Sequence, residues 1–197
     1  KKLKINAEIF VGGSSAKGTL IKKDDYDIDI FIRFDKKHLD GKENISNLTE
    51  KIIKGVNGIK KERIHGSRDY FKVKIKENLF FEVVPVKKIK NQKEAENITD
   101  LSYFHVNYIK KKLKGKILDE VRLAKAFCHA NGCYGAESYI KGFSGYGLEL
   151  LVYYYGSFLK LIKTMTKVKD KLVIDIEKQY KNKNIVLMDL NAAKLKS

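Results

Sequence analysis

The segment from Asp27 to Phe34 alternates its side chains with a period of two, which is the spacing of a β-strand. Successive side chains of a strand point to opposite faces, so Asp27 and Asp29 share one face and the isoleucines beside them share the other. Two adjacent carboxylates repel each other and resist burial unless a cation lies between them. Mg²⁺ prefers oxygen ligands of this kind, so the segment predicts a strand with a metal-binding face. The ordinary alternative is the solvent face of an edge strand.

A glycine-rich turn precedes this strand. The apolar run from Ile9 to Val11 breaks into Gly12-Gly13-Ser14-Ser15. Two glycines let the backbone turn sharply and approach a ligand closely, and the hydroxyl after them can cap a helix whose free N–H groups face an anion. Such a turn is commonplace when it occurs alone. Followed closely by the Asp27 strand, it predicts a phosphate site beside a metal site.

A third carboxylate lies on a predicted hairpin. The segment from Phe71 to Lys76 alternates apolar side chains with lysines, Glu77-Asn78 is a turn signal, and the apolar run from Leu79 to Val86 follows. On this second strand Glu82 stands alone among apolar residues. A buried carboxylate without a partner is costly, so Glu82 either faces solvent at a sheet edge or faces a cation.

Hydrophobic periodicity predicts helices in much of the remaining chain. Their expected ranges are 43–55, 98–113, 117–130, 144–155 and 157–166. In the third of these helices, the residues expected to be buried are Val121, Leu123, Ala124 and Phe127. Further short strands are expected at 59–64, 172–176 and 185–188. Composition changes from strands and turns to aromatic helices near Gly115, where we place a domain boundary.

The balance of charged residues favours an anionic partner. The chain has 41 Lys and Arg residues against 24 Asp and Glu residues, a formal net charge of +17. Such an excess favours binding to a polyanion, and nucleic acid is the first candidate. The alternative is the lysine-rich composition of an A+T-rich or heat-adapted organism.

Cysteine usage and hydropathy indicate the cellular compartment in which we expect the protein. Cys128 and Cys133 are the only cysteines, and their spacing fits neither a zinc site nor a redox pair. We expect two reduced thiols, one on a helix and one in the turn after it. No secretory leader and no apolar run of membrane-spanning length is found, so we expect a cytoplasmic protein without a membrane partner. The chain opens on Lys rather than Met, so we expect an N-terminal piece to be missing.

The glycine-serine turn followed by Asp-x-Asp resembles the signature of nucleotidyltransferases related to DNA polymerase beta. The second half of the chain narrows this resemblance to the archaeal class I CCA-adding enzymes, the tRNA nucleotidyltransferases. The segments that carry the narrower resemblance are 120–127, 131–137, 141–146, 149–151, 155–159, 173–175 and 191–193. The resemblance spans essentially the whole chain.

The resemblance implies an α+β fold, in which a mixed-sheet catalytic domain of the polymerase beta type is followed by a mostly helical central domain. The expected bounds of the two domains are 1–114 and 115–197. We expect the C-terminal tRNA-binding domains of the family to be absent from this chain. We therefore expect weak, salt-sensitive tRNA binding through lysine-rich surfaces, with a second polypeptide as a candidate source of the missing domains.

The resemblance also implies the residues of an active site. Asp27, Asp29 and Glu82 are expected to bind two Mg²⁺ ions, although the family usually has Asp where this chain has Glu82. The resemblance also implies that Glu82 lies on a strand adjacent to the Asp-x-Asp strand. Nucleotide-binding residues are expected at Gly13, Ser14, Lys17, His105, Lys125 and Tyr134. Taken alone, His105 would be interpreted as a surface helix residue, and Lys125 as a lysine whose amine reaches the surface.

The implied reaction is template-independent transfer of CMP and AMP, from CTP and ATP, to the 3′ end of tRNA. The terminal hydroxyl would attack the α-phosphorus in line, while the metals activate this hydroxyl and stabilise the leaving pyrophosphate. The family's base-selecting Arg is not found before Asn191, so the sequence does not identify the base-selecting residue. Two alternatives stay open: another RNA-tailing or oligoadenylate-forming enzyme, and a catalytically inactive RNA-binding subunit.

Overall fold

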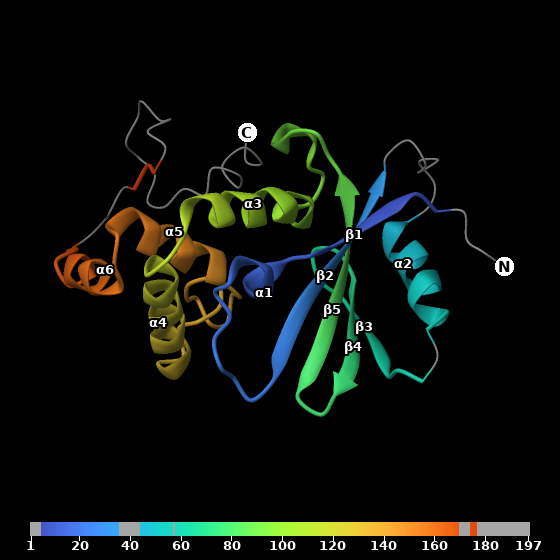
Figure 1. Ribbon diagram of the computed structural model, residues 1–197, viewed down its shortest axis with the longest axis horizontal. Helices are drawn as coiled ribbons and strands as arrows, with labels where there is room; N and C mark the ends of the chain where they lie inside the picture. The colour runs from blue at the N-terminus through green and yellow to red at the C-terminus, as the bar shows by residue number, and fades with distance from the viewer. Residues whose placement is uncertain (1–4, 36–43, 57, 170–173, 177–197) are drawn as a thin grey trace. The chain divides into compact units, whose positions relative to one another are not determined.

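The computed structural model describes residues 5–35, 44–56, 58–169 and 174–176. The chain folds into two compact units, drawn in Figure 1. The first consists of Lys1–Lys17 and Lys22–Val106, and the second of Gly18–Ile21 and Asn107–Ser197. The chain therefore passes between the units three times. The domain bounds expected from the sequence, with a change near Gly115, stay a prediction.

The first unit is built on a five-stranded mixed sheet with the strand order β1-β2-β5-β4-β3. The strands are β1 (Ala7–Val11), β2 (Tyr26–Asp35), β3 (Lys61–Ile64), β4 (Tyr70–Lys76) and β5 (Leu79–Lys88). β2 and β5 run parallel, whereas the other neighbouring pairs run antiparallel. The prediction of an α+β fold with a mixed sheet is confirmed.

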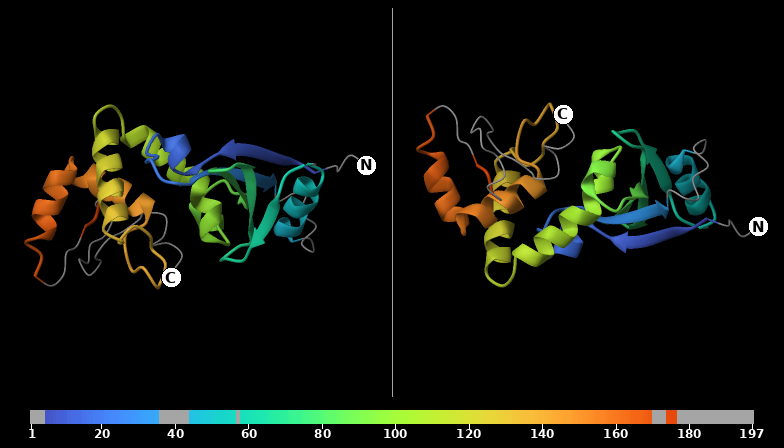
Figure 2. Two further views of the ribbon diagram at one scale, coloured as in Figure 1. Left: turned by 90° about the horizontal axis from the view of Figure 1, so that it is seen from below. Right: turned by 90° about the horizontal axis from the view of Figure 1, so that it is seen from above.

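The alternation of side chains in β2 separates the two faces of this sheet. Ile32 and Phe34 are buried in an apolar core that includes residues of α2 (Ile45–Lys54). The odd-numbered side chains of β2 point to the other face, where the guanidinium of Arg33 lies 4.0 Å from the ring centre of Tyr103 on α3 (Ser102–Lys112). Figure 2 shows α2 and α3 on opposite sides of the sheet. Asp27 and Asp29 therefore share the face that is turned away from α2.

Capping groups set the limits of the helices in the first unit. The side chain of Asn44 accepts a hydrogen bond from the Ser46 N–H at 2.8 Å, and α2 ends at Gly55. The helix expected at 98–113 begins as a 3-10 turn, η3 (Ile98–Leu101), and continues as α3. Asn97 and Asp100 form a capping box at the start of η3. The short elements are α1 (Gly13–Lys17) and η2 (Gln92–Glu94).

The second unit is helical. It contains the second half of α3, followed by α4 (Ile117–Ala130), α5 (Gly145–Tyr155) and α6 (Phe158–Met165). The hydroxyls of Ser144 and Ser157 cap α5 and α6 by accepting backbone hydrogen bonds at 3.0 and 3.3 Å. These three helices lie where the sequence predicts them. Their buried residues form one apolar core with α3: Ile109, Leu113, Val121, Ala124, Leu150, Leu151, Val152, Leu161 and Ile174.

The buried face of α4 differs from the predicted one. Leu123 is 53% exposed and Phe127 is 45% exposed, so both lie at the surface. Leu123 follows Val121 by two positions, which is about 200° around a helix, so the two cannot share a face. The residues that are buried, at the i, i+3, i+4 and i+7 spacing of a single face, are Val121, Ala124, Lys125 and Cys128.

The expected C-terminal strands lie partly or wholly outside the described residues. Of the strand expected at 172–176, only 174–176 is described, and there Ile174 is buried in the core of the second unit. The strand expected at 185–188 and the segment before Asn191 lie outside the described residues. The two thiols are free, as predicted, with Cys128 on α4 and Cys133 in the turn after it. Within the described ranges, no helix is long and apolar enough to cross a bilayer.

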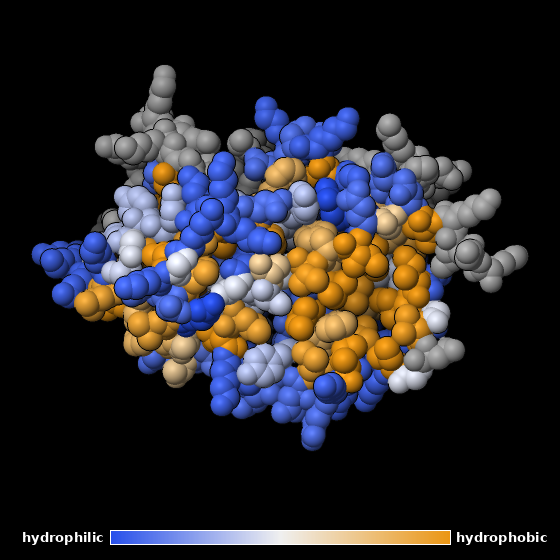
Figure 3. Space-filling model, viewed as in Figure 1, coloured by the Kyte–Doolittle hydropathy of each residue, from blue (hydrophilic) through white to orange (hydrophobic). Residues whose placement is uncertain are grey.

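Hydrophobic side chains reach the surface of the first unit beside α2. Ile9 and Val11 on β1 are 69% and 47% exposed, and Val56 after α2 is 47% exposed. Figure 3 shows hydrophobic side chains gathered over the strands of this unit. Ile9 is paired with Ile32 and so lies on the sheet face that packs on α2. α2 therefore covers only part of that face.

Candidate active site

The parallel pairing of β2 and β5 brings the three predicted carboxylates onto one face of the sheet. In this pairing Glu82 lies directly beside Asp29, and Phe80 lies beside Asp27. Paired residues of adjacent strands point to the same face, so Asp27, Asp29 and Glu82 form a carboxylate group on neighbouring strands. The position expected for Glu82, on a strand next to the Asp-x-Asp strand, is confirmed.

The electrostatics of this carboxylate group show a deficit of positive charge. Burial raises the pKa of Asp29, and the Lys17 charge lowers this pKa only in part, while the Asp27 charge raises it further. Burial, followed by the charges of Asp29 and Asp27, raises the pKa of Glu82 to about 7. Neighbouring carboxylates therefore destabilise the ionised forms of Asp29 and Glu82. A cation bound among them would remove this repulsion.

Lys72 on β4 is a member of this site that the sequence analysis missed. Its Nζ lies 3.1 Å from Oδ1 of Asp27, and Lys72 is paired with Glu82 across the β4–β5 hairpin. A regular hairpin with Glu77-Asn78 as its turn would pair Glu82 with Val73 instead. An irregularity between Lys74 and Lys76 shifts the register by one residue. Such a shift exchanges the two faces of a strand, so the alternation in the sequence could not place Lys72 at the site.

The glycine-rich turn lies against the carboxylate strand. Gly13 has a φ of +56°, and a Cβ atom at this position would lie 1.6 Å from Oδ2 of Asp29. The N–H of Gly12 donates to the backbone carbonyl of Asp29 at 2.8 Å. Only glycine fits here, because it tolerates the positive φ and leaves room for the carboxylate. The structure thus joins the predicted turn and the predicted metal-binding strand.

The serine after the glycines does not have the expected capping position. α1 begins at Gly13, and the Ala16 N–H donates to the carbonyl of Gly12 at 3.1 Å. Ser14 therefore lies inside the first turn of α1 rather than at its N-cap. Lys17 ends α1, and its charge acts on Asp29. His105 is half-buried on the part of α3 that belongs to the first unit.

The other two predicted nucleotide-binding residues belong to the second unit. Lys125 on α4 is 1% exposed, so the interpretation as a lysine that reaches the surface is wrong. Its Nζ donates to Oε1 of Glu149 at 2.7 Å and to Oγ1 of Thr19 at 2.9 Å. Tyr134 follows α4 and is half-buried. A Cβ atom at Gly145 would lie 2.7 Å from the Tyr134 hydroxyl oxygen and 3.5 Å from Lys125 Nζ. The hydroxyl and the ammonium therefore approach the same point at the start of α5.

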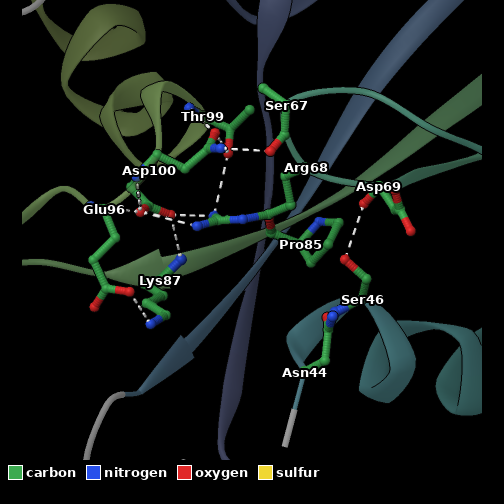
Figure 4. A network of polar contacts seen from close by, with 11 residues as sticks. Asn44, Ser46, Ser67, Arg68, Asp69, Pro85, Lys87, Glu96, Thr99 and Asp100 are labelled. Carbon is green, nitrogen blue, oxygen red and sulfur yellow. Dashed lines mark hydrogen bonds and ion pairs between the residues drawn. The ribbon is translucent and has the colours of Figure 1, made fainter.

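A second polar network of the first unit lies at the other end of β5, beside a cavity of about 570 Å³. Arg68 forms an ion pair with Asp100 and donates to the carbonyl of Pro85 and to the hydroxyl of Thr99, as Figure 4 shows. Asp100 also accepts backbone hydrogen bonds from Lys87, Glu96 and Asn97 at 2.8 to 3.2 Å. Burial would raise the pKa of Asp100, but the hydrogen bonds from Arg68 and the backbone outweigh it and lower this pKa. The cavity is five residues along the strand from Glu82, so the carboxylate group is not part of it.

The donor chemistry of the carboxylate group suits a hard divalent cation. Asp27, Asp29 and Glu82 offer only oxygen ligands, and the raised pKa values of Asp29 and Glu82 show that their negative charge is not balanced. Among the described residues, no three His, Cys, Asp or Glu side chains are already arranged to hold a metal ion. Asp27 contacts Lys72 instead. Metal binding by all three carboxylates therefore requires their side chains to turn toward one another.

Two family models match the chain, one for each half. Residues 1–124 match the nucleotidyltransferase domain, and residues 119–192 match the second domain of tRNA nucleotidyltransferases. A CCA-adding enzyme of Nanoarchaeum equitans (strain Kin4-M) is 42% identical over 190 residues, which are 96% of this chain and 46% of the relative. A CCA-adding enzyme of Saccharolobus shibatae is 36% identical over 85% of this chain and 40% of the relative. The chain thus spans less than half the length of these curated relatives.

Solved structures share the fold at low sequence identity. A structure of the Cid1 poly(U) polymerase with Mg and 3′-dATP bound superposes with a TM-score of 0.54 at 19% identity, over 76% of this chain and 42% of the other. A structure described for the RNA terminal uridylyl transferase activity of Cid1 gives a TM-score of 0.55 at 17% identity, with the same coverage. These likenesses concern the fold. The family model that covers the carboxylate group and the glycine-rich turn shows that the chain belongs to the nucleotidyltransferase family, and the sequence relatives show that it is similar to archaeal CCA-adding enzymes.

Proposed function

We propose that this chain carries the catalytic part of a tRNA nucleotidyltransferase, which adds CMP and AMP from CTP and ATP to the 3′ end of tRNA. One observation carries the proposal. In a chain 42% identical to a CCA-adding enzyme, Asp29 lies in register with Glu82 and packs on Gly13 of the glycine-rich turn. The residue types that bind phosphate and metal thus meet on one sheet face.

In this proposal, Asp27, Asp29 and Glu82 hold Mg²⁺. When bound there, Mg²⁺ lowers the pKa of the attacking 3′ hydroxyl and balances the charge of the triphosphate and the leaving pyrophosphate. Glu82 reaches one methylene further than the usual Asp, and its raised pKa means that it is partly protonated near neutral pH in the absence of a cation. The carboxylate group is therefore poised to exchange a proton for a metal ion.

The remaining predicted residues bind the nucleotide in this proposal. Gly13 and Ser14 present backbone N–H groups and a hydroxyl to phosphate oxygens, and Lys17 adds a positive charge beside Asp29. His105 on α3, Lys125 on α4 and Tyr134 after α4 contact the triphosphate. Hydrogen bonds and positive charges of this kind hold phosphate in place without competing for the metal.

The proposed RNA substrate agrees with the charge of the chain. Its net charge of +17 favours contact with the phosphate backbone, and such contacts weaken steeply as salt is added. We therefore propose that the tRNA is bound by its acceptor end, largely through phosphate contacts. A titration with salt, comparing tRNA with an unrelated RNA hairpin of equal length, measures this. Strong tRNA preference at about 0.2 M salt would contradict it.

The experiment that tests the function is an ordered-addition assay. The purified chain is incubated with Mg²⁺ and tRNA that lacks its terminal CCA, first with each nucleoside triphosphate alone and then with CTP and ATP together. The proposal expects C, C and A to be added in that order, with release of pyrophosphate. Addition of A or U alone in a long tail would indicate another RNA-tailing enzyme, and no addition with any triphosphate would indicate an inactive RNA-binding chain. Asp29→Asn is the matched inactive control.

A further inference from the structure

Three polar side chains are fully buried together in the second unit. Thr19 is 0% exposed, Lys125 is 1% exposed and Glu149 is 0% exposed. The Thr19 hydroxyl donates to Oε1 of Glu149 at 2.6 Å, and Lys125 Nζ donates to both partners at 2.7 and 2.9 Å. Removing charged groups from water is unfavourable unless they are paired with good geometry. We call these three residues the buried triad.

The buried triad joins segments that are far apart in the sequence. Thr19 comes from the Gly18–Ile21 segment, Lys125 from α4 and Glu149 from α5. Arg122, one turn before Lys125 on α4, donates to the carbonyl of Gly18 at 2.7 Å and fixes the same segment. A lysine amine at the end of a four-carbon chain is otherwise mobile. Here two partners on two different segments hold the ammonium at one point.

That point lies next to another predicted nucleotide-binding group. The Tyr134 hydroxyl and Lys125 Nζ both approach Gly145, the first residue of α5. A side chain at Gly145 would have its Cβ atom only 2.7 Å from the Tyr134 oxygen. Glycine therefore leaves the room in which the tyrosine hydroxyl and the ammonium come together.

We propose that Glu149 and Thr19 are positioning residues for the triphosphate of the bound nucleotide. They hold the ammonium of Lys125 beside the Tyr134 hydroxyl, so that the positive charge is already in place when the nucleotide arrives. The inference rests on the proposed function, in which Lys125 contacts the triphosphate. A buried ion pair that only stabilised the second unit would make no difference between ligands with and without a triphosphate.

The test measures equilibrium binding of ATP and AMP, each with Mg²⁺, to the full chain and its variants. Glu149→Gln removes the charge of the carboxylate, and we expect ATP to bind about tenfold more weakly, the effect of one lost charge-assisted hydrogen bond. AMP, which lacks the β- and γ-phosphates, should bind as it does to the wild type. Thr19→Val removes only the hydroxyl, and we expect ATP to bind a few-fold more weakly. Thr19→Ser keeps the hydroxyl and should bind ATP like the wild type.

A matched control separates positioning from loss of stability. Leu161 on α6 is 4% exposed in the apolar core of the same unit. Leu161→Ala should lower the unfolding temperature at least as much as Glu149→Gln, because it leaves a cavity, yet it should bind ATP like the wild type. If Glu149→Gln does not fold, the pair Thr19→Val and Thr19→Ser still decides the matter.

The possible outcomes distinguish this inference from the proposed function. A wild-type chain that binds ATP, with Glu149→Gln and Thr19→Val binding it equally well, overturns the inference and leaves the proposed function standing. Equal weakening of ATP and AMP shows that the triad is only structural, and this also overturns the inference. A wild-type chain that binds no nucleoside triphosphate overturns both.

Discussion

Asp29 and Asp100 are two desolvated aspartates of the first unit whose pKa values shift in opposite directions. Burial raises the pKa of Asp29, and the charge of Asp27 raises it further. Burial acts on Asp100 in the same direction, but Arg68 and the backbone N–H groups of Lys87 and Asn97 lower its pKa. Asp100 is thus satisfied by the protein itself, whereas Asp29 requires a charge from outside.

The opposite pKa shifts distinguish Asp100, whose charge is used within the fold, from Asp29, whose charge is available to bind a ligand. Both residues are ordered by neighbouring elements, so burial alone would not distinguish them. The number of hydrogen bonds from Arg and backbone does distinguish them, because each such bond favours the ionised form. A carboxylate that keeps its repulsion in the folded chain is a candidate for cation binding. Substitutions of these two aspartates and of their neighbours should therefore differ in their effects on activity and stability.

The largest expected effect is the loss of nucleotide transfer in Asp29→Asn. The substitution removes a proposed metal ligand but also removes repulsion from Glu82, so without metal the free energy of unfolding should stay equal or rise by up to about 1 kcal/mol. Pyrophosphate release with Mg²⁺ and urea unfolding without Mg²⁺ measure the two effects. Asp25 is an exposed residue just before β2. The control variant Asp25→Asn should keep both the transfer activity and the free energy of unfolding of the wild type. A parallel loss of stability and activity would make Asp29 structural.

Asp100→Asn should show the opposite pattern. Arg68 would keep its buried charge without a charged partner, and breaking such a pair costs about 3–5 kcal/mol of unfolding free energy. Nucleotide transfer per folded molecule should be unchanged at a temperature where the variant is folded. Because the pKa of Asp100 is lowered on folding, its contribution is present above the ordinary pKa of an aspartate and is lost as pH falls. A variant that lost less than about 1 kcal/mol would show that the backbone bonds alone suffice.

The stability of the metal-free chain should fall as pH rises from about 4.5 to about 7. Glu82 has its pKa raised to about 7 on folding, from the ordinary glutamate value of 4.5, so the folded chain binds more protons in this range. Its contribution is fully present below the ordinary pKa and is lost as pH rises through the raised one, at about 1.4 kcal/mol for each unit of pKa. Unfolding temperatures at a series of pH values measure this.

Glu82→Gln provides the control for the pH series. The unfolding temperature of the variant should depend less on pH over the same range. In the wild type, added Mg²⁺ should restore at neutral pH the unfolding temperature that is lost as pH rises. A wild-type chain that gained stability from pH 4.5 to 7 by the same amount as Glu82→Gln would exclude Glu82 as the titrating group.

The smallest expected effect concerns Lys72. Its ammonium contacts Asp27 at 3.1 Å and would compete with a cation for that carboxylate. Lys72→Met should therefore bind Mg²⁺ a few-fold more tightly, since a partly exposed ion pair contributes at most about 1 kcal/mol. Lys74→Met, the next lysine on the same face of β4, is the matched control and should change little. The rise in unfolding temperature with added Mg²⁺ gives both affinities. Weaker binding in Lys72→Met would show that Lys72 supports the site instead.

The strands that carry the carboxylate group could be predicted because their signals are local. The alternation around Asp29 and the hairpin that ends in β5 can each be recognised from one short continuous segment, and the structure confirms both. That Glu82 lies beside Asp29 came from the resemblance to a known family, since a parallel pairing leaves no local trace in a sequence. The limits of α4 were also predicted, because helical periodicity shows the length of a helix.

Side-chain partners were harder to predict, for different physical reasons. Lys72 was missed because an irregularity in β4 exchanges the faces of the strand. Taken alone, Lys125 would be interpreted as reaching the surface, because lysine is rarely buried without a partner, and its partner Glu149 lies 24 residues away on another helix. Thr19 was missed because it is 106 residues from Lys125. An acidic residue inside the apolar run of α5 is the one sequence signal that could have revealed the buried triad.

Because the chain passes between the two units three times, a single cut in the chain cannot separate the units. A single cut after Val106 would leave Gly18–Ile21 on the N-terminal fragment, although this segment belongs to the second unit. Thr19 and Ile21, which are 0% and 8% exposed, would then be presented to water, and Lys125 would lose one of its partners on the other fragment. Neither fragment would be a self-sufficient folding module. Mixing two such fragments would restore the fold of the second unit only if Gly18–Ile21 of the N-terminal fragment packs among the helices of the other fragment.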